Sequence, residues 1–368
     1  MTARTYRLPK NTSEFTTEVL EALISEMHPG VSIRRWEILD TRQRGEMVST
    51  AGRVKLRIEY GHGSPPLPQN ALVKMVIDGD TVNPVLYETE TNVYRDYLPG
   101  LDIEKPGCLA AAFEPETGGF LLILEDLSAE NAFFPNVMEK PLTAQQVGKL
   151  VDVLASVHAK YWESPKLGGS SQWLSGLSEG RQFEFFDNSV VKWIDTYVET
   201  IPYRADLVTR TGRTPAQLWA YVKAVHRHHE RIFPATLLHG DTGAHNSYHL
   251  PDGRCGFLDW QLSARGAWPR DLHYTICTGL SVADRRVHER QLVERYLARL
   301  SALGVKEVPS IDIAMTAYAR SIVWGFVVGW LMVPTKNYPA VIINANCERL
   351  FAAVTDNNTL ALCEELMP

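Results

Sequence analysis

Two aspartates and an asparagine, Asp241, Asp259 and Asn246, flank a short predicted hairpin in the stretch LLHGDTGAHNSYHLPDGRCGFLDWQ, residues 237–261. Inside it, Asp252–Gly253 is a strong two-residue turn signal between strand-like arms, which predicts a β-hairpin. With that pair as the turn, Asn246 lies opposite Asp259, and opposed side chains share one face about 5 Å apart. An amide oxygen and a carboxylate so placed suit a magnesium ion whose remaining ligands are water and phosphate.

Asp241 stands five positions before Asn246, on the loop that leads into this hairpin. A carboxylate there could orient a hydroxyl close to a metal-bound phosphate, and a metal clamp with such a carboxylate is what phosphoryl transfer needs. Protein kinases space the aspartate and asparagine of their catalytic loop in the same way. The alternative role for these residues, together with Asp259, is turn and cap chemistry, which Asp and Asn also favour.

The first third of the chain supplies a candidate phosphate-binding pair. Lys74 is the only polar residue in the apolar strand-like run ALVKMV, and a buried ammonium is costly without a partner. Glu90 is the predicted partner, because it lies on the aromatic stripe of the helix predicted in NPVLYETETNVYRDYLPG. Glu88 is nearer to the strand, but its helix face is polar. Lys74 alone also fits an edge-strand lysine whose ammonium reaches water.

Two further segments are candidates for nucleotide contacts. The backbone around Asp126 and Leu127, directly after the buried strand that ends in LILED, is the predicted docking point for adenine. The stretch TRQRGEMVSTAGR is a poor phosphate loop with few glycines, and it offers Ser49 and Thr50 as donors.

The elements that must position these residues change character along the chain. Alternation in VKLRIEY, residues 54–60, predicts a half-buried strand, and strands dominate up to Leu127. Helical patterns follow, beginning with the capping-box spacing of Thr143 and Gln146. We therefore predict an α+β protein with a nucleotide-binding lobe at 1–127 and a helical catalytic and acceptor-binding lobe at 128–368.

Composition narrows the class of protein. The chain has 368 residues, a net charge of −6 and no long basic block, which argues against nucleic acid as a partner. Its five cysteines are scattered without a CxxC pair, so a cytoplasmic location is expected. The apolar run at 321–334 is too short to cross a bilayer, and we predict a buried helix there and no membrane segment. The run HRHH, 226–229, is predicted to be a solvated helix face.

The motifs LVKM, ETNVY, LILEDL, LASVHAKYW, LLHGDTGAHN, GFLDWQ and GAWPRDL, spread over residues 71–272, resemble those of a known group. It is the aminoglycoside phosphotransferase and choline-kinase-like superfamily, in particular its ecdysteroid-kinase-like branch. The resemblance implies a bilobal protein-kinase-like fold, with a small antiparallel-sheet lobe containing one helix, a mainly helical lobe, and a nucleotide cleft between them.

By the same resemblance, Asp241 corresponds to the catalytic aspartate, Asn246 and Asp259 to the magnesium ligands, and Lys74 and Glu90 to the ion pair over ATP. It further implies that His239 braces the catalytic loop and that Asp271 anchors the segment after DWQ.

Two departures from the family pattern bear on activity. The phosphate loop is glycine-poor, and DTGAHN has its histidine and glycine exchanged relative to the D-x-H-x-G-N of relatives. His245 beside Asn246 could therefore perturb metal binding.

The sequence thus favours an ATP- and magnesium-dependent small-molecule kinase whose acceptor is an alcohol. Its tryptophan-rich helical lobe suits a neutral or apolar alcohol, and a choline-like acceptor is also open. Two alternatives remain, a nucleotide-binding pseudokinase scaffold and a metal-dependent hydrolase built on His239, Asp241 and His245. No motif in the sequence identifies the acceptor, distinguishes ATP from GTP as the donor, or indicates the oligomeric state.

Overall fold

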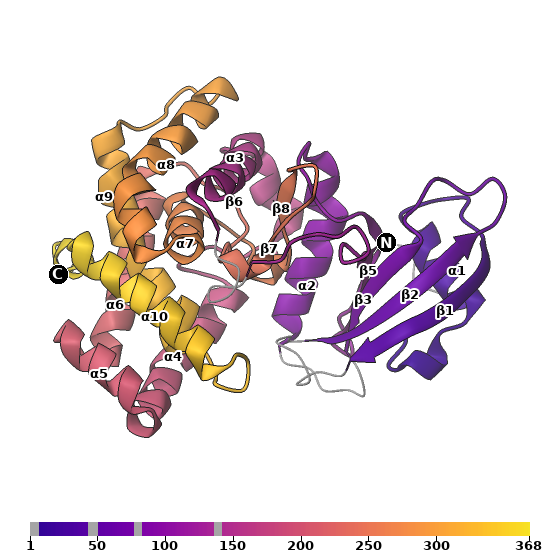
Figure 1. Ribbon diagram of the computed structural model, residues 1–368, viewed down its shortest axis with the longest axis horizontal. Coiled ribbons are helices and arrows are strands. Elements are labelled where there is room, and N and C mark those ends of the chain that lie inside the picture. Colours follow the sequence, from indigo (N-terminus) through magenta and orange to yellow (C-terminus); the bar gives the residue numbers. More distant parts are fainter. Residues whose placement is uncertain (1–6, 43–50, 77–82, 136–141) are drawn as a thin grey trace. The chain divides into compact units, whose positions relative to one another are not determined.

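The computed structural model describes residues 7–42, 51–76, 83–135 and 142–368. The chain divides into two compact units (Figure 1). The small unit comprises Met1–Gly100, Lys105–Phe133 and Leu250–Gly253, and the large unit comprises Leu101–Glu104, Phe134–His249 and Arg254–Pro368.

The small unit is built on a five-stranded antiparallel sheet with the strand order β1-β2-β3-β5-β4. The strands are β1 (Ile33–Arg42), β2 (Gly52–Tyr60), β3 (Asn70–Met75), β4 (Cys108–Glu114) and β5 (Gly119–Glu125). Its helices are α1 (Thr17–Ser25) and α2 (Pro84–Asn92), with short helical turns at Thr12–Glu14 and Leu98–Gly100. After α2 the chain continues as a π-helix, Val93–Tyr97. The sequence predicts one helix here, and the structure adds the nine-residue α1.

Alternating side chains give the two faces of this sheet different partners. On one face, Val54, Leu56 and Ile58 of β2 pack in a single core cluster with Leu20 and Ile24 of α1. The alternate residues of β3, which include Lys74, point to the opposite face because strand side chains alternate. Helix α2 contacts β5 and β4, and Figure 1 shows α1 and α2 on opposite sides of the sheet. The sheet therefore separates an apolar core from the face that carries Lys74.

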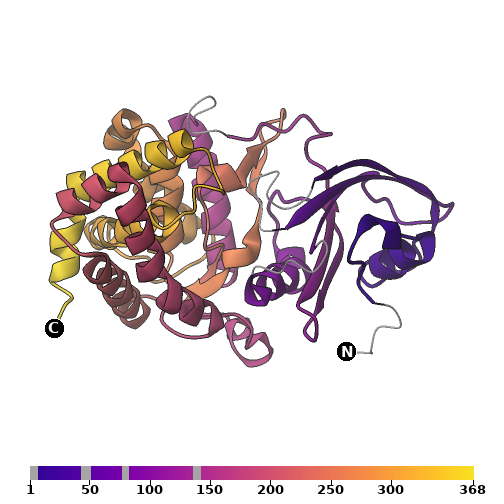
Figure 2. The same ribbon diagram turned by 90° about the horizontal axis from the view of Figure 1, so that it is seen from below.

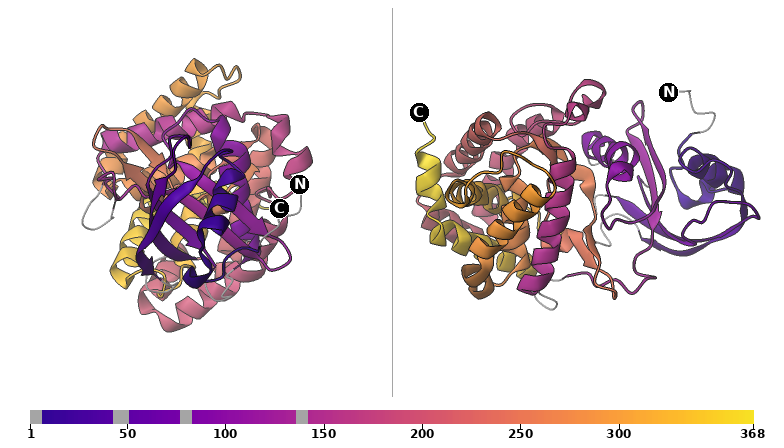
Figure 3. Two further views of the ribbon diagram at one scale, coloured as in Figure 1. Left: turned by 90° about the vertical axis from the view of Figure 1, so that its right-hand side faces the viewer. Right: turned by 90° about the horizontal axis from the view of Figure 1, so that it is seen from above.

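The large unit is mainly helical. Its helices are α3 (Ala144–Lys160), α4 (Arg181–Thr200), α5 (Pro202–Thr211), α6 (Pro215–Ile232), α7 (Pro269–Gly279), α8 (Val282–Ala302), α9 (Ile311–Trp324), α10 (Ala340–Asp356) and α11 (Thr359–Glu364). Its short strands are β6 (Thr236–Leu238) paired with β9 (Ala264–Gly266), and β7 (Ser247–His249) paired with β8 (Cys255–Phe257). Short 3-10 turns occupy Pro165–Leu167, Gly169–Ser171, Ala244–Asn246 and Trp260–Leu262. The strands lie along one edge of the helices (Figures 2 and 3). This mixed architecture confirms the predicted α+β class.

Local sequence signals explain where the major helices begin. Thr143 and Gln146 form the predicted capping box of α3, with reciprocal bonds between side chain and backbone. The same device, Thr214 with Gln217, starts α6, where Pro215 occupies the first helical position. These caps satisfy backbone N–H groups that have no partner within the helix.

The apolar C-terminal run forms a buried helix. Helix α9 continues as a π-helix, Gly325–Leu331. By length and composition the combined segment Ile311–Leu331 is the one described helix that is apolar enough to cross a membrane, yet 67% of its window is buried inside the protein. The tryptophans at its end, Trp324 and Trp330, are only 3% and 1% exposed. Packing within the large unit therefore accounts for its apolar character.

The HRHH run does not form a solvated face, so that part of the prediction is wrong. His226 and His229 are buried on the inner face of α6, whereas Arg227 is exposed. Residues three apart share one helix face, and here that face packs inward. Burial lowers the pKa of His229 to about 3 and also lowers the pKa of His226, so these two histidines are neutral core residues at neutral pH.

Candidate active site

The small unit contains a fully formed lysine–glutamate ion pair. Lys74 Nζ lies 2.7 Å from Glu90 Oε1 and 2.8 Å from Oε2, and the two side chains are 7% and 1% exposed. The pair forms because β3 presents Lys74 to the face where α2 buries Tyr87 and Glu90. Glu90 is thus confirmed as the partner, in preference to the half-buried Glu88. A rigidly held ammonium of this kind can bind phosphate oxygens.

The backbone after β5 combines a fixed turn with an open donor. Asp126 Oδ2 lies 2.9 Å from Lys55 Nζ, and Asp126 Oδ1 accepts hydrogen bonds from the backbone N–H and hydroxyl of Ser128. Burial alone would raise the pKa of Asp126, but these contacts from Ser128 and Lys55 outweigh it and lower that pKa. Among the described residues, the N–H of Leu127 has no hydrogen-bond acceptor. The side chain of Asp126 is therefore structural, and the N–H of Leu127 is available to a base. The other two predicted nucleotide contacts, Ser49 and Thr50, lie outside the described residues.

In the large unit, a buried aspartate holds the backbone of the loop before Asp241. Asp271 Oδ2 accepts a hydrogen bond from the N–H of His239 at 2.7 Å, and Oδ1 accepts one from Gly240 at 3.0 Å. His158, itself bonded to the hydroxyl of Tyr296, lies 3.4 Å from Asp271. The prediction that Asp271 anchors the segment after DWQ is therefore wrong. Asp271, in the first turn of α7, instead holds the segment that precedes the hairpin, at His239 and Gly240.

The side chain of His239 braces this loop, as the resemblance implies. Its Nε2 bonds the carbonyl of Leu258 at 2.9 Å, and its Nδ1 accepts the N–H of Asp241 at 3.2 Å. Because both ring nitrogens are occupied, His239 is unsuited to bind a metal. Burial is the main reason that the pKa of His239 falls to about 4, so the neutral ring makes both bonds.

Gly240 is required by the same loop. Its φ is +86°, and a Cβ at this position would lie 1.8 Å from the carbonyl oxygen of Leu262. No side chain fits there, so the glycine of HGD allows the close approach of two backbone segments that carry Asp241 and the region after Asp259.

Arg270 is a part of this site that motif reasoning missed. It is 5% exposed, its guanidinium lies 4.2 Å over the ring of Trp324, and it donates to the carbonyl of Gly240 at 3.2 Å. Burial lowers the pKa of Arg270 to about 10, with Asp271 and Asp241 opposing that shift. The only sequence signal was its place in the quoted motif GAWPRDL, whose role could not be assigned without the loop above it.

The carboxylate of Asp241 is electrostatically strained. Burial raises its pKa to about 7, and the negative charge of Asp259 adds to that rise, while a hydrogen bond from Asn246 and the charge of Arg270 oppose it. Two like charges in a buried place raise the pKa of at least one of them. A bound cation would relieve this repulsion.

The hairpin brings Asn246 and Asp259 to Asp241, but not by the predicted register. The observed partners are Ser247 with Phe257 and His249 with Cys255, which shifts the register by one residue. The reason is the turn: the N–H of Gly253 bonds the carbonyl of Leu250, and Gly253 has φ +88°. The loop therefore has three residues, Pro251 to Gly253, and ends in a left-handed glycine, as three-residue hairpins do.

Asp259 compensates for the shift through its own backbone. The N–H of Leu258 bonds the carbonyl of Asn246 at 2.7 Å, and Asp259 follows in a left-handed conformation with φ 64° and ψ 63°. Asn246 Nδ2 donates to the carbonyl of Asp241 at 3.0 Å, and Asn246 Oδ1 has no protein donor among the described residues. A carboxylate and an amide oxygen thus lie beside Asp241, and both are donors that magnesium accepts.

No group of three or more His, Cys, Asp or Glu side chains in the described part of the chain is arranged to hold a metal ion. The predicted pair fits a different kind of site, since one carboxylate and one amide leave most of the coordination to phosphate and water. The engaged ring of His239 also argues against a zinc site built on the three loop residues His239, Asp241 and His245.

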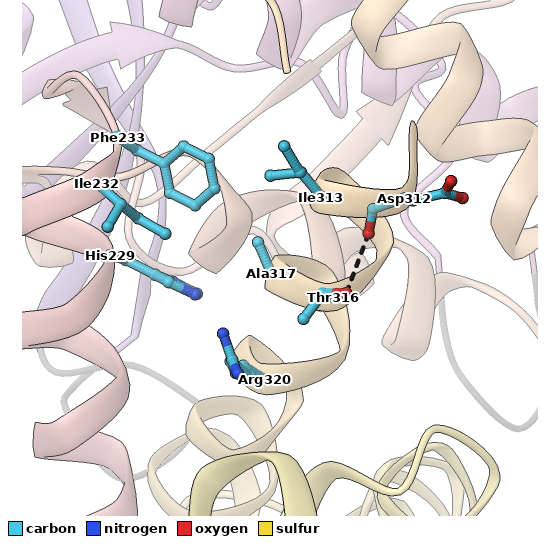
Figure 4. Close-up of a pocket in the computed structure, with 8 residues that line it drawn as sticks. All are labelled: His229, Ile232, Phe233, Asp312, Ile313, Thr316, Ala317 and Arg320. Atoms are coloured by element: carbon cyan, nitrogen blue, oxygen red, sulfur yellow. Dashed lines mark hydrogen bonds between the residues drawn. The ribbon is translucent and has the colours of Figure 1, made fainter. Parts of the chain in front are cut away.

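A cavity of about 330 Å³ lies elsewhere in the large unit, between α6 and α9 (Figure 4). It is lined by His229, Ile232, Phe233, Asp312, Ile313, Thr316, Ala317 and Arg320. The guanidinium of Arg320 is already bonded to the carbonyl of Leu362 and to Glu365, and Thr316 to the backbone of α9. None of the predicted site residues lines this cavity.

The sequence model of the ecdysteroid kinase-like family matches residues 46–306. No curated protein sequence matches the chain. Among solved structures, a choline kinase from Cryptosporidium parvum is similar, with 12% identity, a TM-score of 0.53, and coverage of 96% of this chain and 98% of that one.

Two further solved structures are similar. One is an ethanolamine kinase from Plasmodium vivax, with 15% identity, a TM-score of 0.50, and coverage of 86% of this chain and 81% of that one. The other is a spectinomycin phosphotransferase in complex with ADP and spectinomycin, with 15% identity, a TM-score of 0.44, and coverage of 96% and 100%. The choline kinase and the ethanolamine kinase support the bilobal kinase-like fold.

Proposed function

Because the chain belongs to the ecdysteroid kinase-like family, we propose that it is an ATP- and magnesium-dependent phosphotransferase acting on a hydroxyl of a small molecule. Family membership itself indicates small-molecule kinase chemistry. The donor, the metal and the roles of individual residues are the proposal, and they are supported by the geometry of the two units.

The observation that carries the proposal is the placement of Asp241, Asn246 and Asp259. Two carboxylates and an amide oxygen without a protein donor among the described residues meet where the loop before β7 and the segment after β8 come together, which is unfavourable without a cation and suited to one. A magnesium ion held by Asn246 and Asp259 would supply neutralisation of the phosphate charge. Asp241, which is not needed as a ligand, is then free to face the acceptor.

Other residues of the chain bind the nucleotide and orient the acceptor in the proposed reaction. Lys74, fixed by Glu90, binds the α- and β-phosphates, and the N–H of Leu127 bonds the adenine. Asp241 accepts the hydrogen bond of the acceptor hydroxyl, orients that oxygen toward the γ-phosphorus and receives its proton. The new oxygen–phosphorus bond forms as the bond to ADP breaks, and positioning with charge stabilisation supplies most of the rate enhancement.

Aromatic side chains near Asp241 bear on the acceptor. Trp330 and Tyr338 both contact the ring of His245, which in turn lies beside Asp241. Such a surface suits an acceptor with an apolar or quaternary ammonium group next to its hydroxyl. All five cysteines are free thiols, and we place the enzyme in the cytoplasm on that ground.

Mass spectrometry of reaction products tests the proposal. The protein is incubated with ATP and magnesium and, in separate reactions, with an ecdysteroid, choline, ethanolamine or spectinomycin, the compounds named by the similar proteins. We expect one class to gain a single phosphate group, and Asp241→Asn to abolish that product. Lack of any Mg-dependent ATP turnover, with these alcohols or with water, would refute the proposed function and favour the pseudokinase scaffold.

A further inference from the structure

His245 and Asp241 present unused hydrogen-bonding capacity at the same place. His245 Nε2 lies 3.9 Å from Asp241 Oδ1, and their side chains are 22% and 18% exposed. That distance is too long for a hydrogen bond between them. Neither ring nitrogen of His245 has a hydrogen-bond partner among the residues that the structure describes. Both groups therefore reach solvent side by side, and each can still bind a third atom.

The imidazole of His245 is held in a fixed orientation. Trp330 contacts it edge to face at 5.4 Å and 82°, and Tyr338 does so at 5.7 Å and 76°. The ring also packs on Gly243, where an added Cβ would lie 2.3 Å from its Cε1 atom. Any larger residue at position 243 would displace the ring, so the exchange of glycine and histidine in DTGAHN gives His245 the room it occupies.

The segment that carries Trp330 is fixed from behind. Arg204 of α5 is 1% exposed and donates to the carbonyls of Leu331 and Val333 at 3.0 and 2.6 Å. These bonds satisfy carbonyls at the end of the π-helix, which otherwise have no partner within the helix. Trp330, one of the two aromatic contacts of His245, is thereby part of the buried core.

One oxygen atom can bond both groups, because hydrogen bonds of about 2.8 Å to each side close a triangle over the 3.9 Å gap. We infer that His245 is a second catalytic contact to the attacking oxygen, an inference that rests on the proposed function. An alcohol oxygen has four directions: its carbon, its proton, and two lone pairs. The proton points to Asp241, one lone pair attacks phosphorus, and the other accepts the hydrogen bond of His245 Nε2–H.

The step balances with this contact in place. The attacking lone pair becomes the new bond to the γ-phosphorus, the bond from that phosphorus to the β-phosphate oxygen breaks, and ADP leaves with the electron pair. The proton of the hydroxyl passes to Asp241. His245 gains and loses no proton, and its role is to fix the direction of the lone pair, since small misplacements of reacting atoms cost about 10²-fold in rate.

Two substitutions separate hydrogen bonding from packing. His245→Phe keeps an aromatic ring between Trp330 and Tyr338 but loses the donor, whereas His245→Gln keeps an N–H at the same reach. The assay is Mg-dependent ATP hydrolysis with water as the acceptor. We expect His245→Phe to lower kcat about 10- to 100-fold with KM for ATP unchanged, and His245→Gln to retain most of the wild-type kcat.

His288→Phe on α8 is the matched control and should leave kcat unchanged. A thermal melt of each variant verifies folding. Wild-type kcat in His245→Phe, or equal losses in His245→Phe and His245→Gln, would overturn the inference while leaving the proposed function intact. Absence of turnover in the wild type, or its persistence in Asp241→Asn, would instead refute the proposed function and the inference with it.

Discussion

The two units bury charge in opposite ways. In the small unit, Lys74 and Glu90 neutralise each other at 2.7 Å, and the pair is complete without any ligand. In the large unit, Asp259 raises the pKa of Asp241 further above the rise that burial alone causes, so two like charges are held together. The first arrangement leaves no uncompensated charge in the small unit's core. The second is unfavourable for the fold alone, which supports the proposal that a cation binds there.

The largest expected effect concerns the carboxylate of Asp241 in the large unit. Asp241→Asn removes the group that orients the acceptor and receives its proton, and loss of such a group costs about 10²- to 10⁴-fold in rate. We expect Mg-dependent ATP turnover to fall by about 10³-fold while the melting temperature holds or rises, because a carboxylate that the charge of Asp259 repels is removed. A large drop in melting temperature would show that Asp241 serves the fold instead.

The corresponding change in the small unit should have the opposite effect on stability. Glu90→Gln leaves the buried ammonium of Lys74 facing a neutral amide, and breaking a buried ion pair costs about 3–5 kcal/mol. Hydrogen exchange measured by mass spectrometry should show lost protection in peptides of β3 and α2.

Glu88→Gln, on the half-buried face of α2, is the matched control and should change protection little. Similar effects of the two variants would contradict the assignment of Glu90 as the partner of Lys74.

The large unit should lose stability in acid through its buried histidines. Burial lowers the pKa of both His229 and His273 to about 3, against about 6.5 in an unfolded chain. Below pH 6.5 these histidines therefore bind protons in the unfolded chain but not in the folded unit. The free energy of unfolding of the large unit consequently falls as the pH falls. Each group costs about 2 kcal/mol by pH 5. Asp241, whose folded-state pKa is raised, contributes with the opposite sign between pH 7 and 4.

Tryptophan fluorescence isolates this effect, because all tryptophans except Trp36 lie in the large unit. Urea unfolding at pH 7 and pH 5 should give a smaller difference in unfolding free energy for His229→Gln than for the wild type. An identical difference in both proteins would show that His229 titrates normally.

The smallest expected effect concerns Asp259, whose negative charge repels that of Asp241. Asp259→Asn removes the neighbouring charge that helps to raise the pKa of Asp241, and one pKa unit corresponds to about 1.4 kcal/mol. At pH 8 without magnesium we expect the large unit to become about 1 kcal/mol more stable in urea unfolding. Destabilisation would mean that Asp259 supports the loop instead of straining it.

The sequence predicts which side chains of the site lie close together, but it does not predict the backbone conformation that brings them there. The helical face that buries Glu90 follows from residue spacing, so the contact with Lys74 could be predicted. The hairpin register could not, because Asp252–Gly253 is compatible with both two- and three-residue turns, and the choice depends on which residue adopts φ +88°. Asp259 still reaches Asp241 through a left-handed backbone, which no side-chain pattern encodes.

The sequence also does not show which polar side chains are buried. His226 and His229 are chemically polar and lie in a charged stretch, so a solvated face was predicted. Their inward position follows only from what α6 packs against. Arg270 and Arg204 were missed for the same reason, since each acts by bonding backbone carbonyls of a segment distant in sequence.

Nucleotide affinity measured with and without magnesium tests the central claim most directly. Isothermal titration of a non-hydrolysable ATP analogue should give a Kd that magnesium lowers by about tenfold or more in the wild type, equivalent to at least about 1.4 kcal/mol. Asp259→Asn should lose that gain, whereas Lys74→Met should bind weakly in both conditions. A Kd that does not respond to magnesium in the wild type, or a gain that survives in Asp259→Asn, would contradict the account.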